Sequence, residues 1–193
     1  MILPITAYGD PVLKKVTQDI TPEYPNLKTL IDNMWETMYS AEGVGLAAPQ
    51  VGLDIRMAVI DASPFATDDE LPKAEREFLK TFKKVFINPH ISERWGEPWG
   101  MEEGCLSLPG IHEKVFRPDA IRITYMDENW VEHTDEFTGY AARVIQHEYD
   151  HLDGKVFTDH LSPLTRRMIQ KRLSSISEGR VKTHYPMRFP RRK

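Results

Sequence analysis

The chain has 193 residues, of which 40% are hydrophobic and 28% charged, and its net charge is −4. This profile is typical of one globular domain, and the sequence shows no repeats and no low-complexity tract. The single cysteine, Cys105, excludes a disulfide framework within the chain and indicates a reducing compartment. The sequence shows no secretory signal and no apolar run near the roughly 20 residues that span a bilayer. We therefore expect a cytoplasmic protein with no membrane partner.

The charge is unevenly distributed along the chain. Residues 163–193 contain ten Lys or Arg and a single acid, Glu178, so the rest of the chain is acidic. A basic end on an acidic body indicates an anionic partner such as RNA. A solvated C-terminal helix with a frayed basic end explains the same pattern, and the sequence leaves both explanations open.

Hydrophobic periodicity predicts a first helix over 26–40. Its inward face is formed by residues at i, i+4, i+7 and i+11: Leu27, Ile31, Met34 and Met38. Two glycines end this helix and open a loop over 43–50. Apolar runs predict strands at 56–60 and 85–89. The polar stretch 61–84 between them is expected to be an exposed insertion with a short helix.

The second half of the chain predicts further strands, followed by two helices. We expect a loop or irregular hairpin at 95–104 and a hairpin formed by strands at 120–126 and 131–137. Helices are predicted at 139–152 and, after a Ser-Pro start, at 163–178.

Strands in the middle with helices around them indicate an α+β fold. We expect one domain over 1–193, with mixed or antiparallel strands packed around the central helix 139–152 and with a C-terminal helix. The insertion 61–84 and a basic tail at 179–193 complete the predicted organisation.

The central helix carries the strongest chemical signal, Gln146-His147-Glu148-Tyr149-Asp150-His151. Histidines four residues apart are separated by about 40° around a helix, so both rings can reach one metal ion. Glu148 projects into the apolar side of this helix, where a carboxylate is costly unless it is functional or paired. The alternative is structural, with hydrogen-bonded core histidines and an ion pair between Glu148 and an arginine such as Arg122.

A catalytic metal site usually has three protein ligands, so the two histidines need a partner. Cys105 lies in a predicted loop beside Gly104, and it can supply a thiolate. The commonest alternative for a lone cysteine is a small buried hydrophobe.

Three segments of the chain, taken together, resemble the three signature motifs of the peptide deformylases. In chain order they are Gly43-Val44-Gly45-Leu46-Ala47-Ala48-Pro49-Gln50, Glu103-Gly104-Cys105-Leu106-Ser107 and Gln146-His147-Glu148-Tyr149-Asp150-His151. The resemblance covers most of the chain, and the ordered set is far more specific than any one motif. Two positions depart from the family pattern. His112 stands where the family has an arginine, and Arg143 stands where it has an aliphatic residue.

The resemblance implies a metal-dependent hydrolase that removes the N-formyl group from the N-terminal methionine of newly made polypeptides and releases formate. It implies Cys105, His147 and His151 as metal ligands. The implied catalytic residues are the general base and acid Glu148, the oxyanion donors Gln50 and Leu106 (through its backbone N–H), and Gly45, which shapes the cleft. The implied substrate-binding residues are Gly43, Val44, Glu103 and Val144, with Leu106 also in the methionine pocket.

The resemblance further implies one divalent metal ion, Fe²⁺ in cells, which Zn²⁺, Ni²⁺ or Co²⁺ can replace. The implied partners are N-formylmethionyl peptides and the ribosome, reached through the basic C-terminal helix and tail, with no DNA partner. The residues alone also allow another HExxH metallopeptidase, or a non-catalytic metal-stabilised module that binds the ribosome or RNA.

Overall fold

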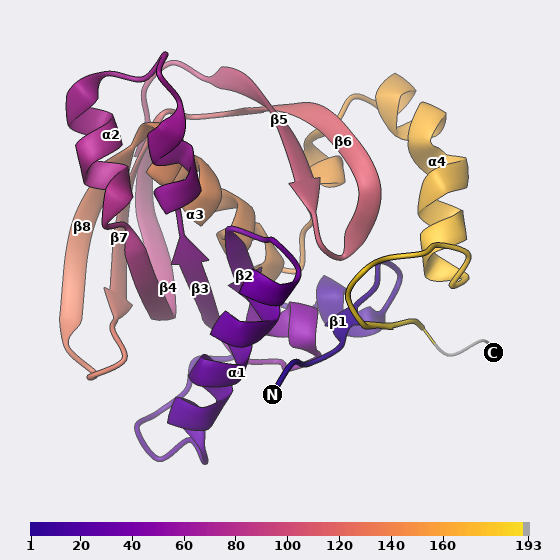
Figure 1. Ribbon diagram of the computed structural model, residues 1–193, viewed down its shortest axis with the longest axis horizontal. Coiled ribbons are helices and arrows are strands. Elements are labelled where there is room, and N and C mark those ends of the chain that lie inside the picture. Colours follow the sequence, from indigo (N-terminus) through magenta and orange to yellow (C-terminus); the bar gives the residue numbers. More distant parts are fainter. Residues whose placement is uncertain (191–193) are drawn as a thin grey trace.

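The computed structural model describes residues 1–190, and its centre is a five-stranded antiparallel sheet (Figure 1). The strand order is β2-β3-β4-β7-β8, with every neighbouring pair antiparallel. The bounds of these strands are β2 (Gly45–Ala47), β3 (Met57–Asp61), β4 (Lys83–Trp95), β7 (Ala120–Met126) and β8 (Glu132–Thr138). The predicted α+β class is confirmed.

Two helices cover opposite faces of this sheet, α1 (Leu27–Ser40) and α3 (Gly139–Leu152). Val59 of β3 packs in one cluster with the buried face of α1, whereas its neighbour Ala58 packs against Leu152 of α3. Because successive strand residues point to opposite faces, the two helices must lie on opposite sides. This double cover explains why β3 is an almost continuous apolar run.

A separate hairpin, β5 (Trp99–Cys105) and β6 (Leu108–Arg117), lies beside the main sheet. The prediction placed Cys105 in a loop, but it is the last residue of β5, next to a register shift after Gly104. Strand β6 was not predicted, because Pro109 and Gly110 interrupt its alternation of buried and exposed residues.

The C-terminal helix α4 (Pro163–Ser177) begins as predicted, with the Ser162 hydroxyl accepting from the N–H of Thr165. It buries three residues against a cluster that includes β6: Ile169, Leu173 and Ile176. The chain then turns back, and β9 (Met187–Arg188) pairs in parallel with β1 (Ile5–Thr6). In Figure 1 this returning segment lies beside the start of the chain. No helix within residues 1–190 has the length and apolar character needed to cross a bilayer.

Residues 61–84 pack against the start of α3. They include a 3-10 turn (Ser63–Thr67) and the predicted short helix, α2 (Lys73–Lys80). The Glu75 carboxylate accepts from the N–H of Tyr140 at 3.2 Å, and the rings of Phe65 and Tyr140 are 4.9 Å apart. The carboxylate therefore meets the positive end of the helix that carries the HExxH motif. Other short 3-10 helices are Pro11–Lys14, Ala48–Val51 and Phe157–His160.

Candidate metal centre and active-site cleft

Helix α3 is buried around most of its circumference, because the sheet covers one side and the β5-β6 hairpin the other. Arg143, Gln146 and Asp150 fall outside the apolar side expected from sequence, yet all three are buried. Hydrogen bonds to backbone carbonyls hold two of these side chains: Arg143 donates to the Val115 carbonyl at 2.9 Å, and Gln146 donates to the Pro118 carbonyl at 3.0 Å. The helix thus provides a rigid, enclosed base for the motif.

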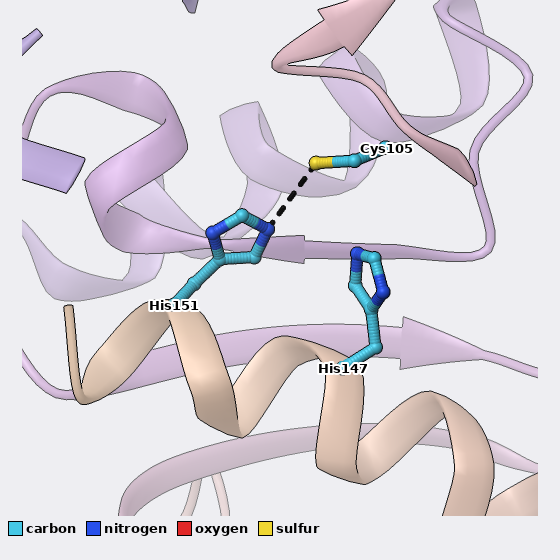
Figure 2. Close-up of side chains that lie close together, drawn as sticks. All are labelled: Cys105, His147 and His151. Atoms are coloured by element: carbon cyan, nitrogen blue, oxygen red, sulfur yellow. Dashed lines mark hydrogen bonds between the residues drawn. The ribbon is translucent and has the colours of Figure 1, made fainter. Parts of the chain in front are cut away.

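Cys105, His147 and His151 converge on one point (Figure 2). The two imidazole rings project from neighbouring turns of α3 with centroids 5.3 Å apart, and the thiol reaches them from the end of β5. Cys105 Sγ lies 3.3 Å from His151 Nε2, and candidate ligand atoms of the three residues lie within 4.8 Å of one another. These separations suit a single ion bound between them.

The His147 ring is oriented by Glu103, whose Oε1 lies 2.9 Å from Nδ1. A proton on Nδ1 leaves the lone pair of Nε2 available to a metal, the usual arrangement for a ligating histidine. The same carboxylate accepts from Arg117 at 2.8 and 2.9 Å and from Arg143 at 2.9 Å. Glu103 was assigned to substrate binding, but its carboxylate is engaged by these three side chains.

The environment of Cys105 favours the thiolate. Burial by itself raises the pKa of this thiol, but the positive charge of His151 and hydrogen bonds from both histidines lower it to about 5. A thiolate with two imidazoles is a donor set that suits zinc and other transition metals. The three residues therefore fit a metal ion, and the alternative of an inert buried cysteine does not explain their convergence.

Glu148 is a buried carboxylate without a countercharge in direct contact. Its Oε2 has no hydrogen-bond partner among the described residues. The proposed structural partner, Arg122, instead pairs with Glu93 at 2.7 Å and with Glu136 at 2.6 Å. Burial raises the pKa of Glu148, although the nearby histidines oppose the shift. A buried carboxylate with a raised pKa beside a candidate metal site is a candidate for proton transfer.

The glycines of the loop 43–50 allow close approach of other groups. A Cβ on Gly45 would lie 2.5 Å from Glu148 Oε1, and a Cβ on Gly43 would lie 2.8 Å from Leu106 Cδ1. Neither contact is tolerable without movement of the neighbouring side chain. Glycine at these positions leaves space for the side chains of Glu148 and Leu106.

Gln50 presents its amide N–H groups to the site. Its side-chain oxygen accepts from the N–H of Ala47 at 2.9 Å, which fixes the orientation of the amide. The nitrogen Nε2 then lies 3.5 Å from Cys105 Sγ and 3.3 Å from Ser107 Oγ. Gln50 is therefore a preorganised donor beside the candidate metal.

These groups open into a cavity of about 930 Å³. Residues assigned from sequence to catalysis or substrate binding line it: Gly43, Val44, Gly45, Gln50, Glu103, Leu106, Val144 and Glu148. His112 also lines the cavity, close enough to Gly104 that a Cβ there would lie 2.6 Å from its Nδ1. One wall of the cavity was not predicted, and it is formed by residues 182–185 of the returning C-terminal segment. No local pattern could have placed them there.

Comparisons with known proteins agree with this geometry. Residues 2–167 match the family described as "Polypeptide deformylase". A protein from Christiangramia forsetii named "Peptide deformylase" is 58% identical over 193 residues, covering 100% of this chain and 98% of that protein. A crystal structure of a peptide deformylase from Legionella pneumophila matches with a TM-score of 0.76 at 34% identity, covering 93% of this chain and 98% of that one. The corresponding protein from Thermotoga maritima gives a TM-score of 0.71 at 39% identity, covering 84% of this chain and 99% of that one. The chain therefore belongs to the polypeptide deformylase family.

Proposed function

We propose that the residues gathered in this cleft carry out the reaction of the family. That reaction is the hydrolytic removal of the formyl group from the N-terminus of new polypeptides, and the chain is an enzyme of this kind. The observation that carries the assignment of roles is the unpaired carboxylate of Glu148 beside the cluster of Cys105, His147 and His151.

In this proposal Glu148 moves the protons. Its carboxylate takes a proton from the attacking water as oxygen bonds to the formyl carbon, and later gives that proton to the departing amine nitrogen. The C–N bond breaks, and the products are formate and a peptide with a free N-terminal amine. A divalent metal held by Cys105, His147 and His151 supplies Lewis acidity, which polarises the formyl oxygen and makes water more acidic. Burial suits Glu148 to this exchange, since a raised pKa brings a carboxylate nearer to neutral pH.

Gln50 and the backbone N–H of Leu106 are proposed to stabilise the negative charge that develops on the formyl oxygen. Gln50 is held in the donating orientation before substrate arrives, so it needs no reorganisation during the reaction. This role is supported by the position of Leu106, which directly follows the candidate ligand Cys105 and lines the cavity.

The methionine side chain is proposed to lie against Gly43, Leu106 and Val144, with Glu103 forming part of the wall. Val44 lies next to β2 and is proposed to pair with the extended peptide as a neighbouring strand would. Gly43 and Gly45 line the cavity on either side of Val44.

The metal in cells is proposed to be Fe²⁺, with Zn²⁺, Ni²⁺ and Co²⁺ as substitutes. A thiolate and two imidazoles accept all four ions, so the donor set is compatible with the exchange. Metal analysis of protein purified without oxygen, followed by a formate assay, tests this. Zinc as the only metal in fully active anaerobic protein would overturn the iron assignment.

A formylmethionyl peptide separates this function from that of another HExxH peptidase. We expect stoichiometric formate release from the formylated peptide and no cleavage of the same peptide without its formyl group. Cleavage at an internal amide bond would favour the peptidase. Metal binding with no turnover of either peptide would favour the non-catalytic module.

We further propose that the enzyme works in the cytoplasm, where new polypeptides emerge and a thiolate ligand stays reduced. Docking to the ribosome is proposed to use the exposed face of α4. Arg166 and Arg172 approach Asp159 and Glu113. Among the described residues no ion pair involves Arg167 or Lys171, on the face that also exposes Leu164 and Met168. This face can contact phosphates while α4 remains packed.

Charge reversal tests this docking. The double variant Arg167→Glu and Lys171→Glu should weaken ribosome binding strongly, and the wild-type affinity should fall steeply with salt. The control reverses two exposed lysines elsewhere, Lys14 and Lys73, and should bind nearly as the wild type does. Equal losses in both variants, or salt-independent binding, would contradict a specific contact through α4.

A further inference from the structure

The segment that follows α4 returns to the active-site cleft. Its strand β9 pairs with β1, where the N–H of Ile5 donates to the Pro186 carbonyl at 2.9 Å and the N–H of Ala7 donates to the Arg188 carbonyl at 2.8 Å. The match to the family ends at residue 167, so this return lies outside the part of the chain that the family description covers. Its position beside β1 can be followed in Figure 1.

Tyr185 connects this return to the active site. Its side chain is buried in a small cluster with Ile5 and Ala41, and Leu106 packs against the same cluster. Its hydroxyl donates to the carbonyl of Leu106 at 2.8 Å, although the two residues are 79 positions apart. This contact reaches the residue whose N–H is proposed to bind the formyl oxygen.

The turn at residues 106–107 lies between β5 and β6 and is anchored by tertiary contacts. Gln50 lies 3.3 Å from Ser107 Oγ, and the N–H of Tyr8 donates to the Ser107 carbonyl at 2.9 Å. Within residues 1–190, the side chain that donates a hydrogen bond to the carbonyl of Leu106 is that of Tyr185. The register shift after Gly104 interrupts the regular hairpin at the same point.

We propose that Tyr185 is a positioning residue for the reaction. The N–H and the carbonyl of Leu106 lie in the two peptide planes that meet at its Cα, so fixing the carbonyl limits the movement of the plane that carries the N–H. Tyr185 thereby holds the Leu106 N–H at the position of the formyl oxygen through the backbone of Leu106. This inference rests on the proposed function for the oxyanion role of Leu106, while the anchoring itself rests on the observed hydrogen bond.

The test is Tyr185→Phe, which removes the hydroxyl and keeps the ring in its cluster. The matched control is Tyr125→Phe, since Tyr125 is also buried, its hydroxyl donates to Asp135 at 2.8 Å, and it is not one of the residues that line the cavity. Outright loss of an oxyanion donor costs about 10²–10³ in kcat. A donor that is kept but less well aimed should cost less, and we expect kcat to fall about tenfold with KM within about twofold.

A second readout does not depend on turnover. Hydrogen exchange of the peptide that covers residues 104–108 should be faster in Tyr185→Phe than in the wild type and unchanged in Tyr125→Phe. Metal content and Tm should remain similar in the two variants, which separates positioning from global destabilisation.

The outcomes are distinguishable. If wild-type protein releases formate and Tyr185→Phe equals Tyr125→Phe in kcat and exchange, Tyr185 is only a packing residue and the inference is wrong. A raised KM with unchanged kcat would also overturn it, because Tyr185 would then act only as a wall. If wild-type protein releases no formate, the proposed function fails, and unchanged exchange at 104–108 would show separately that Tyr185 does not hold the turn.

Discussion

The two parts of the molecule that supply the candidate ligands are held in different ways. Helix α3 carries His147 and His151 on its own backbone, so one turn of helix sets their relative position. The turn after β5, which follows Cys105, depends on groups that are distant in sequence. Gln50, Tyr8 and Tyr185 reach it from three other segments. The helical half of the site is therefore positioned by local helix geometry. The other half, which we call the tertiary half, is positioned by contacts between segments that are distant in sequence.

Glu103 links the two halves. It lies on β5 two residues before Cys105, and its carboxylate holds the ring of His147 on α3. Arg117 joins the same carboxylate and also donates to Asp150 at 2.8 Å. Replacement of Glu148, which lies in α3 outside this network, should therefore affect chemistry and leave the scaffold intact, whereas changes at Glu103 should affect both.

The largest expected effect is at Glu148. In Glu148→Gln the kcat for formate release should fall about 10²–10⁴-fold, because the group that moves protons is gone. Stability should stay the same or rise, since a neutral amide replaces a buried carboxylate whose Oε2 has no hydrogen-bond partner within residues 1–190. Steady-state kinetics, metal content and thermal unfolding measure these quantities.

Asp150→Asn is the matched control on the same helix. The Asp150 carboxylate accepts from Arg117 and lies 2.7 Å from His160 Nε2, so the change should cost stability, up to about 3–5 kcal/mol. It should spare kcat far more than Glu148→Gln does. Near-normal turnover in Glu148→Gln would refute the proton-transfer role.

The second effect is on the tertiary half of the site. Gln50→Ala should lower kcat about 10²–10³-fold, since it removes one oxyanion donor. Gln146→Ala is the control, because Gln146 is also buried but donates to the carbonyl of Pro118. It should lower Tm with little change in kcat. Similar kinetics in the two variants would contradict a donor role for Gln50.

The third effect concerns the link between the halves. Glu103→Gln should weaken metal affinity about 10–100-fold, because His147 loses the carboxylate that orients its ring. Competition with a chelator measures the affinity. Glu113→Gln changes the cross-strand neighbour, which lies near Arg172 instead, and should keep wild-type affinity. Unchanged affinity in Glu103→Gln would show that helix geometry alone suffices to orient His147.

The smallest effect is at the cleft glycines. Gly45→Ala should lower kcat about tenfold, because the added methyl group forces Glu148 to move. Gly43→Ala meets the flexible end of Leu106 instead and should mainly raise KM. Kinetics with a formylmethionyl peptide distinguish the two. A rise in KM alone for Gly45→Ala would show that Glu148 is not displaced.

Much of the fold was predictable because its determinants are local. The spacing of Ile31, Met34 and Met38 predicted α1, and all three are buried against the sheet. The start of α4 at Ser162 followed from capping chemistry. Strand β6 was not predicted, because its alternating pattern is interrupted. The burial of Arg143 was not predicted either, because it depends on carbonyl groups that the β5-β6 hairpin brings to α3.

The sequence by itself determined that two imidazoles and a carboxylate share one turn of helix, because helical periodicity acts over four residues. It also presented Cys105, Gln50 and Leu106 as candidates through the ordered motifs. The fold was needed to show that Glu103 faces His147, that no arginine within residues 1–190 pairs with Glu148, and that Tyr185 anchors Leu106. These contacts join segments up to 79 residues apart, and packing of the whole chain, not any local preference, brings them together.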